Sequence, residues 1–269
     1  MSAGVPMSGN VPVSRVAWVN PVTRLAGALI LSLPLFLTLD WVSAVTVVGL
    51  EIGVWLGVHP GERWRQVRRL ALRSIPFLIA APLAGLSLAL YGKPAGQTFF
   101  AWGLIEISEQ SLSYAAAVAA RVVALGMAAI ITLSDVDPTE MADGLAQVWR
   151  LPARFVLGTL AGVRLISVLT ADWKTMELAR RARGLGDHRA IRRFATLAFA
   201  LLVSAIRRGS TLATAMEARG FGEGERTWAR PSTLGRADLI YYLVTVMVVG
   251  VGLLVSLITG HFRWIGDVL

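Results

Sequence analysis

Residues 25–58 read LAGALILSLPLFLTLDWVSAVTVVGLEIGVWLGV, an apolar run interrupted by only two charged residues, Asp40 and Glu51. One straight helix of this length would be about 50 Å long, whereas the hydrocarbon core of a bilayer is about 30 Å thick. We therefore expect two short membrane-spanning helices that are joined near Asp40. This stretch alone indicates a membrane protein.

The rest of the chain has the same apolar character. Of its 269 residues, 55% are hydrophobic, and the mean hydropathy is +0.62, which is too apolar for an ordinary soluble domain. Further spans of about 20 residues are predicted over 70–91, 114–133 and 239–259. The chain has no cysteine, and its three histidines are far apart in sequence, so we expect neither disulfides nor a metal cluster.

The distribution of basic residues predicts the orientation. Five arginines lie between the second predicted span and the first turn of the third, at positions 63, 65, 68, 69 and 73, whereas the loop 92–113 has Lys93 as its one basic residue. Short loops rich in Lys and Arg stay in the cytoplasm, so the N-terminus is predicted to be cytoplasmic. The segment 135–236 then lies on the same side with 16 of the 26 Lys and Arg residues. This charge favours anionic lipid and acidic protein partners, and no nucleic-acid partner is expected.

The predicted fold class is all-α, with about five transmembrane helices and two long cytoplasmic helices. Four parts follow along the chain. They are a cytoplasmic N-terminal segment (1–24), a four-helix membrane region (25–134), a cytoplasmic region with the two long helices (135–236), and a last transmembrane helix with a short outer tail (237–269).

The cytoplasmic region has the pattern of three helices. Asp137 followed by Pro138 is typical of a helix start and predicts a short helix. After Pro152, apolar residues recur every three or four positions, which predicts a helix of about 30 residues. Asp187 is a credible N-cap for a second long helix that ends at Gly220.

Each long helix ends in the same motif. The sequence A-R-G-L-G-D occupies 182–187, and A-R-G-F-G-E occupies 218–223. Glycine after a helix adopts the left-handed conformation that terminates it, and an arginine suits the negative end of the helix dipole. One copy is explained as a helix stop. Two copies suggest two equivalent docking points, where each arginine gives a forked donor to an acidic group.

The candidate partner-binding residues are accordingly six in number: Ala182, Arg183, Gly184, Ala218, Arg219 and Gly220. The neighbouring Arg180 and Arg181 leave open which arginine of the first motif makes the main contact.

Three charged residues lie in or beside the apolar runs, where an ionisable side chain is by default a functional candidate. Glu51 and Arg121 are predicted to form an intramembrane ion pair between neighbouring spans. Asp40 is interpreted as a solvated acid of the outer turn. The alternative is a proton relay, but a relay requires a chain of such groups.

The chain resembles the transmembrane T component of energy-coupling factor transporters, the family of cobalt, nickel and biotin uptake systems. The resemblance covers nearly the whole chain, and the paired Ala-Arg-Gly motifs are its most specific part. It also includes Asn20-Pro21-Val22-Thr23-Arg24 before the first span and Pro138-Thr139-Glu140-Met141 after the fourth.

The resemblance implies a multi-pass scaffold in the inner or plasma membrane of a prokaryote, with the two motifs docked on a pair of ATP-binding-cassette ATPases. The membrane spans would hold a separate substrate-binding S component for uptake of a vitamin or transition-metal ion. The partner ATPases would bind ATP. Since the sequence has no G-x-x-x-x-G-K-[ST] loop, we expect no cofactor and no enzymatic activity in this chain.

Two other classes remain as alternatives. Glu177-Leu178-Ala179 followed by Gly184 loosely resembles the docking loop of an ordinary ATP-binding-cassette importer permease, but the expected I-x-L-P ending is missing. An ion-coupled secondary transporter or channel that uses the charges within the spans is the third hypothesis.

Overall fold

The computed structural model describes residues 19–58, 63–91, 98–102, 105–184, 190–221, 227–228, 230–260 and 262. It divides the chain into two compact units. The membrane unit comprises Met1–Val136 with Leu234–Leu269, and the inserted unit comprises Asp137–Thr233. The predicted N-cap Asp187 and the three histidines lie outside the described residues.

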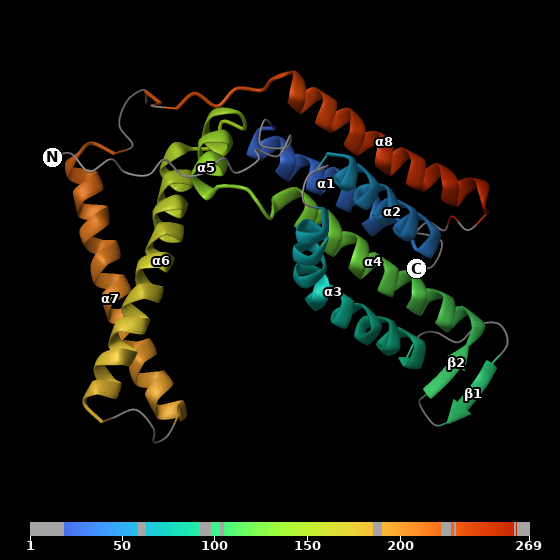
Figure 1. The fold of residues 1–269 in the computed structure, drawn as a ribbon, viewed down its shortest axis with the longest axis horizontal. Helices are drawn as coiled ribbons and strands as arrows, with labels where there is room; N and C mark the ends of the chain where they lie inside the picture. The colour runs from blue at the N-terminus through green and yellow to red at the C-terminus, as the bar shows by residue number, and fades with distance from the viewer. Residues whose placement is uncertain are drawn as a thin grey trace. The chain divides into compact units, whose positions relative to one another are not determined.

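The membrane unit contains five helices (Figure 1). They are α1 (Pro21–Leu37), α2 (Trp41–Val58), α3 (Arg63–Tyr91), α4 (Glu109–Leu133) and α8 (Arg236–Ile258). The first apolar run is therefore broken into two helices beside Asp40, which confirms the expectation from its length. Asn20 caps α1 by accepting a hydrogen bond from the Val22 N–H at 3.0 Å, and Pro21 occupies the first turn.

The inserted unit contains the short helix α5 (Pro138–Gln147) and the two long helices α6 (Ala153–Ala182) and α7 (Ala190–Ala218). Asp137 caps α5 as predicted, since its carboxylate accepts the Thr139 N–H at 2.6 Å. This hydrogen bond is the main reason that the pKa of Asp137 is lowered. The Gln147 side chain then ties α5 to the returning chain, donating to the Arg230 carbonyl and accepting from the Ser232 N–H, both at 2.9 Å.

Length and apolar composition allow five of the described helices to cross a bilayer, namely α2, α3, α4, α6 and α8. Helix α1 is apolar but has only 17 residues. The chain is therefore an all-α, multi-pass membrane protein. The length and hydropathy of α6 do not by themselves distinguish a cytoplasmic helix from a membrane span.

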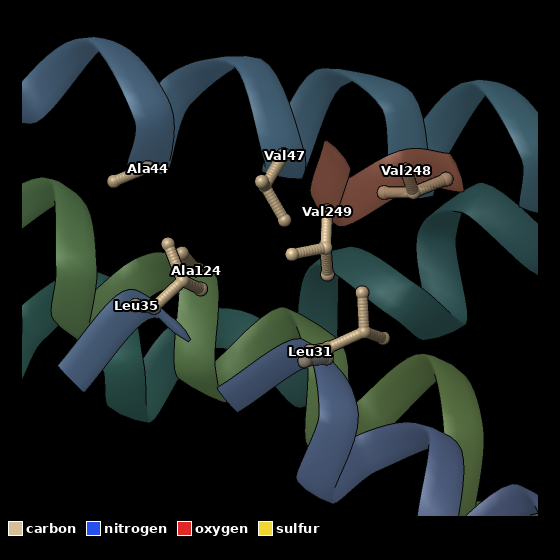
Figure 2. Packing of buried hydrophobic residues seen from close by; sticks show 8 residues of the cluster. Leu31, Leu35, Ala44, Val47, Ala124, Val248 and Val249 are labelled. Carbon is tan, nitrogen blue, oxygen red and sulfur yellow. The ribbon is translucent and has the colours of Figure 1, made fainter. Parts of the chain in front are cut away.

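The core of the membrane unit lies where α1, α2, α4 and α8 meet (Figure 2). Leucine and valine side chains from three helices face alanines of α2 and α4; the set is Leu31, Leu35, Ala44, Val47, Ala124, Ala128, Val248 and Val249. Small residues let the backbones approach, as at Gly252, where an added Cβ would lie 2.5 Å from Val47 Cγ2. Close packing of this kind drives helix association where lipid removes the hydrophobic contrast.

Helix α3 begins several residues before the span predicted at 70–91, because the arginines from Arg63 onward continue the helix. Pro76 and Pro82 lie within it, and Figure 1 shows α3 bent along its length, as internal prolines cause. Arg73 pairs with Asp135 after α4 at 3.3 Å. Both side chains are exposed, so this pair contributes at most about 1 kcal/mol.

A feature that the sequence did not predict precedes α4. Strands β1 (Thr98–Trp102) and β2 (Ile105–Ser108) pair in antiparallel register as a two-stranded sheet. Ser108 ends the sheet and caps α4, because its hydroxyl accepts the Ser111 N–H at 3.2 Å and the Ser111 hydroxyl accepts the Ser108 N–H at 2.9 Å. Helix α4 therefore starts before the predicted residue 114.

Candidate functional site

The two Ala-Arg-Gly motifs end their helices with matching backbone geometry. Ala182 and Ala218 are the last residues of α6 and α7. The glycines that follow have positive φ angles, +70° at Gly184 and +68° at Gly220. This confirms the left-handed glycine predicted for each helix stop.

Hydrogen bonds close both helix ends in the same way. The Gly184 N–H donates to the Arg181 carbonyl at 3.0 Å, and the Gly220 N–H donates to the Glu217 carbonyl at 2.9 Å. At the second motif, the Phe221 N–H also donates to the Met216 carbonyl at 3.0 Å, which completes a Schellman motif. The repeated sequence therefore specifies one repeated local structure.

All six motif residues are exposed. At the end of α6, Arg181 pairs with Glu177 one turn earlier at 2.8 Å, and Arg180 donates to the Thr196 hydroxyl of α7 at 3.2 Å. Within the described residues, neither an ion pair nor a hydrogen bond engages the guanidinium groups of Arg183 and Arg219. Of the three arginines near the first motif, Arg183 is thus the one whose side chain is not held by the helix pair.

The two motifs lie at opposite ends of the helix pair. Helices α6 and α7 run in opposite directions and cross (Figure 1). The first motif ends α6 just before α7 begins, and the second ends α7 after 29 helical residues. The 29 residues of α7 make it about 43 Å long, so the first motif precedes this helix and the second follows it.

Polar and aromatic contacts join α6 and α7 where the two helices cross. Trp173 and Phe194 place their ring centroids 5.5 Å apart with a tilt of 53°. Asp172 of α6 pairs with Arg208 of α7 at 2.8 Å. The base of α6 is fixed separately by α5, where Ala142 and Ala146 pack on Val156. These contacts therefore join α6 to both α5 and α7.

Large apolar side chains remain exposed on both helices. They include Phe155, Ile166 and Leu178 of α6 and Ile191, Phe194, Phe199, Leu202 and Ile206 of α7. Exposed apolar surface on this scale is typical of a protein or membrane contact.

Alanine at Gly220 is expected to destabilise the end of α7 by about 1–2 kcal/mol, because its φ of +68° strains any residue with a Cβ. Gly209 is the matched control, since it lies inside α7 with no atom within 4 Å of an added Cβ. There alanine should stabilise the helix by about 0.5–1 kcal/mol. Hydrogen exchange of the amides at 216–221 measures both effects, and equal protection in the two variants would contradict the helix-stop geometry.

The prediction that Glu51 and Arg121 form an ion pair is not supported by the geometry. Both carboxylate oxygens of Glu51 are buried without a hydrogen-bond partner, and so are Nε and Nη2 of Arg121. The residue whose charge acts on Arg121 is Asp40. The sequence places Glu51 and Arg121 on different helices, but it does not give the rotation of each helix about its axis.

Asp40 is also not the solvated loop acid that its position suggested. Its side chain is 3% exposed. The carboxylate accepts the Ser43 N–H at 2.7 Å, the Ser43 hydroxyl at 2.9 Å, and the Ser256 hydroxyl of α8. It therefore caps α2 and ties it to α8. The spacing of Asp40 and Ser43 is a helix-cap signal that could have been recognised, whereas the contact with Ser256 could not.

Comparison with known proteins identifies similar sequences over most of the chain. The sequence model of the CbiQ family, described as cobalt transport protein, matches residues 14–228. An energy-coupling factor transporter transmembrane protein, EcfT, of Heliobacterium modesticaldum is 30% identical over 91% of this chain and 92% of its own length. The EcfT of Limosilactobacillus fermentum is 27% identical over 61% of this chain and 67% of its own.

A relative of another kind is named an ABC transporter ATP-binding protein, from Bifidobacterium longum. It is 25% identical over 90% of this chain, but the match occupies only 32% of that protein. A segment similar to most of this chain is thus part of a longer polypeptide there.

Proposed function

The chain belongs to the CbiQ family of cobalt transport proteins, and from this membership and its helix pair we infer that it is the transmembrane T component of an energy-coupling factor importer. Its partners are two ATP-binding-cassette ATPases on the cytoplasmic side and a membrane-embedded S component that binds the vitamin or metal ion. ATP is bound by the ATPases. The chain itself couples their cycle to transport, without a cofactor or catalysis of its own.

The observation that carries this proposal is the pair of equal helix ends. Each presents an exposed arginine just before a left-handed glycine; one precedes α7 and the other follows it, and α7 is about 43 Å long. Two separate but equivalent docking points fit two copies of one kind of partner. The guanidinium fork of Arg183 or Arg219 suits an acidic group in a groove of each ATPase.

The proposed coupling mechanism depends on the contacts between the crossed helices α6 and α7. When ATP draws the two ATPases together, the helix ends held in their grooves move with them. The contacts Trp173–Phe194 and Asp172–Arg208 make α6 and α7 move as levers about their crossing. The exposed apolar side chains of both helices form the binding surface for the S component. The S component then reorients and releases its ligand into the cytoplasm.

The packing of α6 and α7 favours a cytoplasmic position for both. Helix α6 is apolar enough to span a bilayer, but α7 packs along it and carries four arginines, at positions 192, 193, 207 and 208. Arginines in the middle of a lipid-facing helix are costly. The charges therefore favour the aqueous phase, and the positive-inside rule supports a cytoplasmic N-terminus as well. The cell is proposed to be prokaryotic.

The Bifidobacterium longum relative supports the link to an ATPase, because a T-like segment there shares one polypeptide with a sequence named as ATP-binding. The alternative of an ordinary importer permease is less favoured. Glu177, the first residue of its candidate docking loop, is engaged by Arg181 within α6, and the segment is the end of a helix.

Stoichiometry tests the proposal directly. The chain, co-expressed with ATP-binding-cassette ATPases of the same cell and purified in detergent, should retain two ATPase subunits per copy by native mass spectrometry. ATP hydrolysis should require those subunits. Hydrolysis by the purified chain alone, or retention of no ATPase, would overturn the proposal and favour the channel or secondary-transporter hypothesis.

A further inference from the structure

A cavity of about 480 Å³ lies inside the membrane unit, between α1, α2, α4 and α8. Its volume is in the range of small-molecule sites, about 300–1,000 Å³, and exceeds what one side chain fills. Most of the wall is apolar, with Val54, Ile131, Ile240 and Val244 among its residues. A ligand that fills it therefore presents hydrocarbon to most of the surface.

The cavity lies at one end of the helix bundle. It is lined near the start of α1 by Arg24, at the end of α2 by Val58, near the end of α4 by Thr132, and near the start of α8 by Ala237. The chain leaves this same end toward the inserted unit, after Val136, and returns to it. With the orientation proposed above, the cavity is at the depth of the inner lipid leaflet.

Among the described residues, one acid of the cavity wall, Glu51, has no hydrogen-bond partner. Glu51 is 5% exposed, and neither of its carboxylate oxygens accepts a hydrogen bond from the protein. A buried carboxyl group without hydrogen bonds is costly, and such a residue within a span is by default a functional candidate. No described arginine or lysine forms an ion pair with it. The described part of the chain therefore leaves the Glu51 carboxyl group open to a donor from a bound molecule.

Two polar groups accompany this acid. Arg24 and the Tyr241 phenol also line the cavity, and both Arg24 and Glu51 act electrostatically on Tyr241. Tyr241 fits because Gly27 leaves room for it, since a Cβ there would lie 2.5 Å from the tyrosine ring. One positive group, one negative group and a phenol hydroxyl thus line an otherwise largely apolar cavity.

From this arrangement we propose that the cavity is a binding site for phosphatidylethanolamine of the inner leaflet. Its primary ammonium group donates hydrogen bonds to Glu51, its phosphate faces Arg24, and an acyl chain fills the apolar part between α2 and α8. The zwitterionic headgroup matches the two opposite charges in the wall, and the ammonium has the N–H donors that the carboxylate lacks. This site is independent of the ATPase contacts and does not rest on them.

Lipids with other headgroups test whether the primary ammonium group is what Glu51 recognises. Phosphatidylcholine has the same phosphate and acyl chains, but its quaternary ammonium has no N–H donor. Phosphatidylglycerol has hydroxyl donors but no positive charge to offset Glu51. Selectivity for the primary amine over both is therefore the signature of the proposed contact.

The test titrates the delipidated full-length chain in detergent with each lipid of identical acyl chains, followed by native mass spectrometry. Phosphatidylethanolamine should bind at least about tenfold more tightly than phosphatidylcholine, since its ammonium makes charged hydrogen bonds. Glu51→Gln should reduce this ratio to about one while phosphatidylcholine binding is retained, which shows that the cavity is intact. Glu140→Gln, an exposed acid of α5, is the matched control and should keep the preference.

A second variant tests the location. Val244→Trp should fill the apolar part of the cavity and lower the affinity for both lipids at least about tenfold, since the acyl chain loses its place. Equal binding of both lipids to the wild type, or an unchanged preference in Glu51→Gln, would overturn the assignment. Competition by water-soluble phosphoethanolamine at the same concentration would also overturn it. Loss of the lipid when the S component binds would overturn it too, because a helix of the partner would then be the occupant of the cavity.

Discussion

Reversing the charge of both motif arginines, Arg183→Glu with Arg219→Glu, is expected to abolish ATPase binding. Removal of one partner from a buried, charged interface pair costs at least about 2 kcal/mol, and two sites together cost about 4 kcal/mol, or about a thousandfold in affinity. Both residues are exposed at helix ends, so the chain should still fold. Affinity purification of the co-expressed complex, with ATP hydrolysis as a second readout, measures the loss.

The chain provides a matched control for this variant. Arg192 and Arg207 are also exposed on α7, so Arg192→Glu with Arg207→Glu changes the net charge equally while leaving both motifs intact. If the control loses the ATPases as well, net charge and not the motif decides binding. If the motif variant retains them, the motifs are only helix stops.

Single variants separate the two docking points. Arg183→Glu should leave one ATPase on the intact second motif. Arg180→Glu should leave both, because Arg180 is held on Thr196 within the helix pair. The reverse outcome would make Arg180 the main contact of the first motif.

Replacing Asp40 by leucine is expected to cause the largest loss of stability in the membrane unit, about 2–4 kcal/mol. The substitution removes the cap of α2 and leaves the hydroxyl groups of Ser43 and Ser256 without their acceptor. It also removes the negative charge that acts on Arg121. The midpoint of thermal unfolding, followed by size-exclusion chromatography of the detergent-solubilised chain, measures the effect.

Ser256→Ala is the control for this prediction, because it removes only the hydrogen bond from α8. Side-chain hydrogen bonds between membrane helices average about 0.6 kcal/mol, so Ser256→Ala should lower the stability several-fold less than Asp40→Leu. If Asp40→Leu is as stable as the wild type, Asp40 would be the solvated acid of an outer turn after all.

Some features of the fold were predictable from short stretches of sequence, whereas others depend on contacts between residues far apart in the chain. The break near Asp40 was predictable because an apolar run of 34 residues is too long for one bilayer. The ends of α6 and α7 were predictable because glycine is the residue that readily adopts a positive φ angle there. The hairpin of β1 and β2 was not, since two short strands in a loop have little local signal.

The residues of the candidate site could also be predicted from the sequence, but their arrangement in space could not. Ala182–Gly184 and Ala218–Gly220 could be named from a repeat in the sequence, but their separation across a crossed helix pair could not. Nor could the sequence show that Arg180 and Arg181 are engaged by Thr196 and Glu177 while Arg183 is not. These differences depend on where each side chain points around its helix.

The sequence by itself determined that this is an all-α membrane protein, where its helices break, and that two of them end in the same motif. These are properties of short segments, set by apolar length and backbone conformation. Only the tertiary structure decided that Asp40 is buried on Ser256, that Glu51 and Arg121 do not pair, and that Glu51 lines a cavity with Arg24 and Tyr241. Such contacts join residues up to 216 positions apart, and they depend on how each helix is rotated against its neighbours.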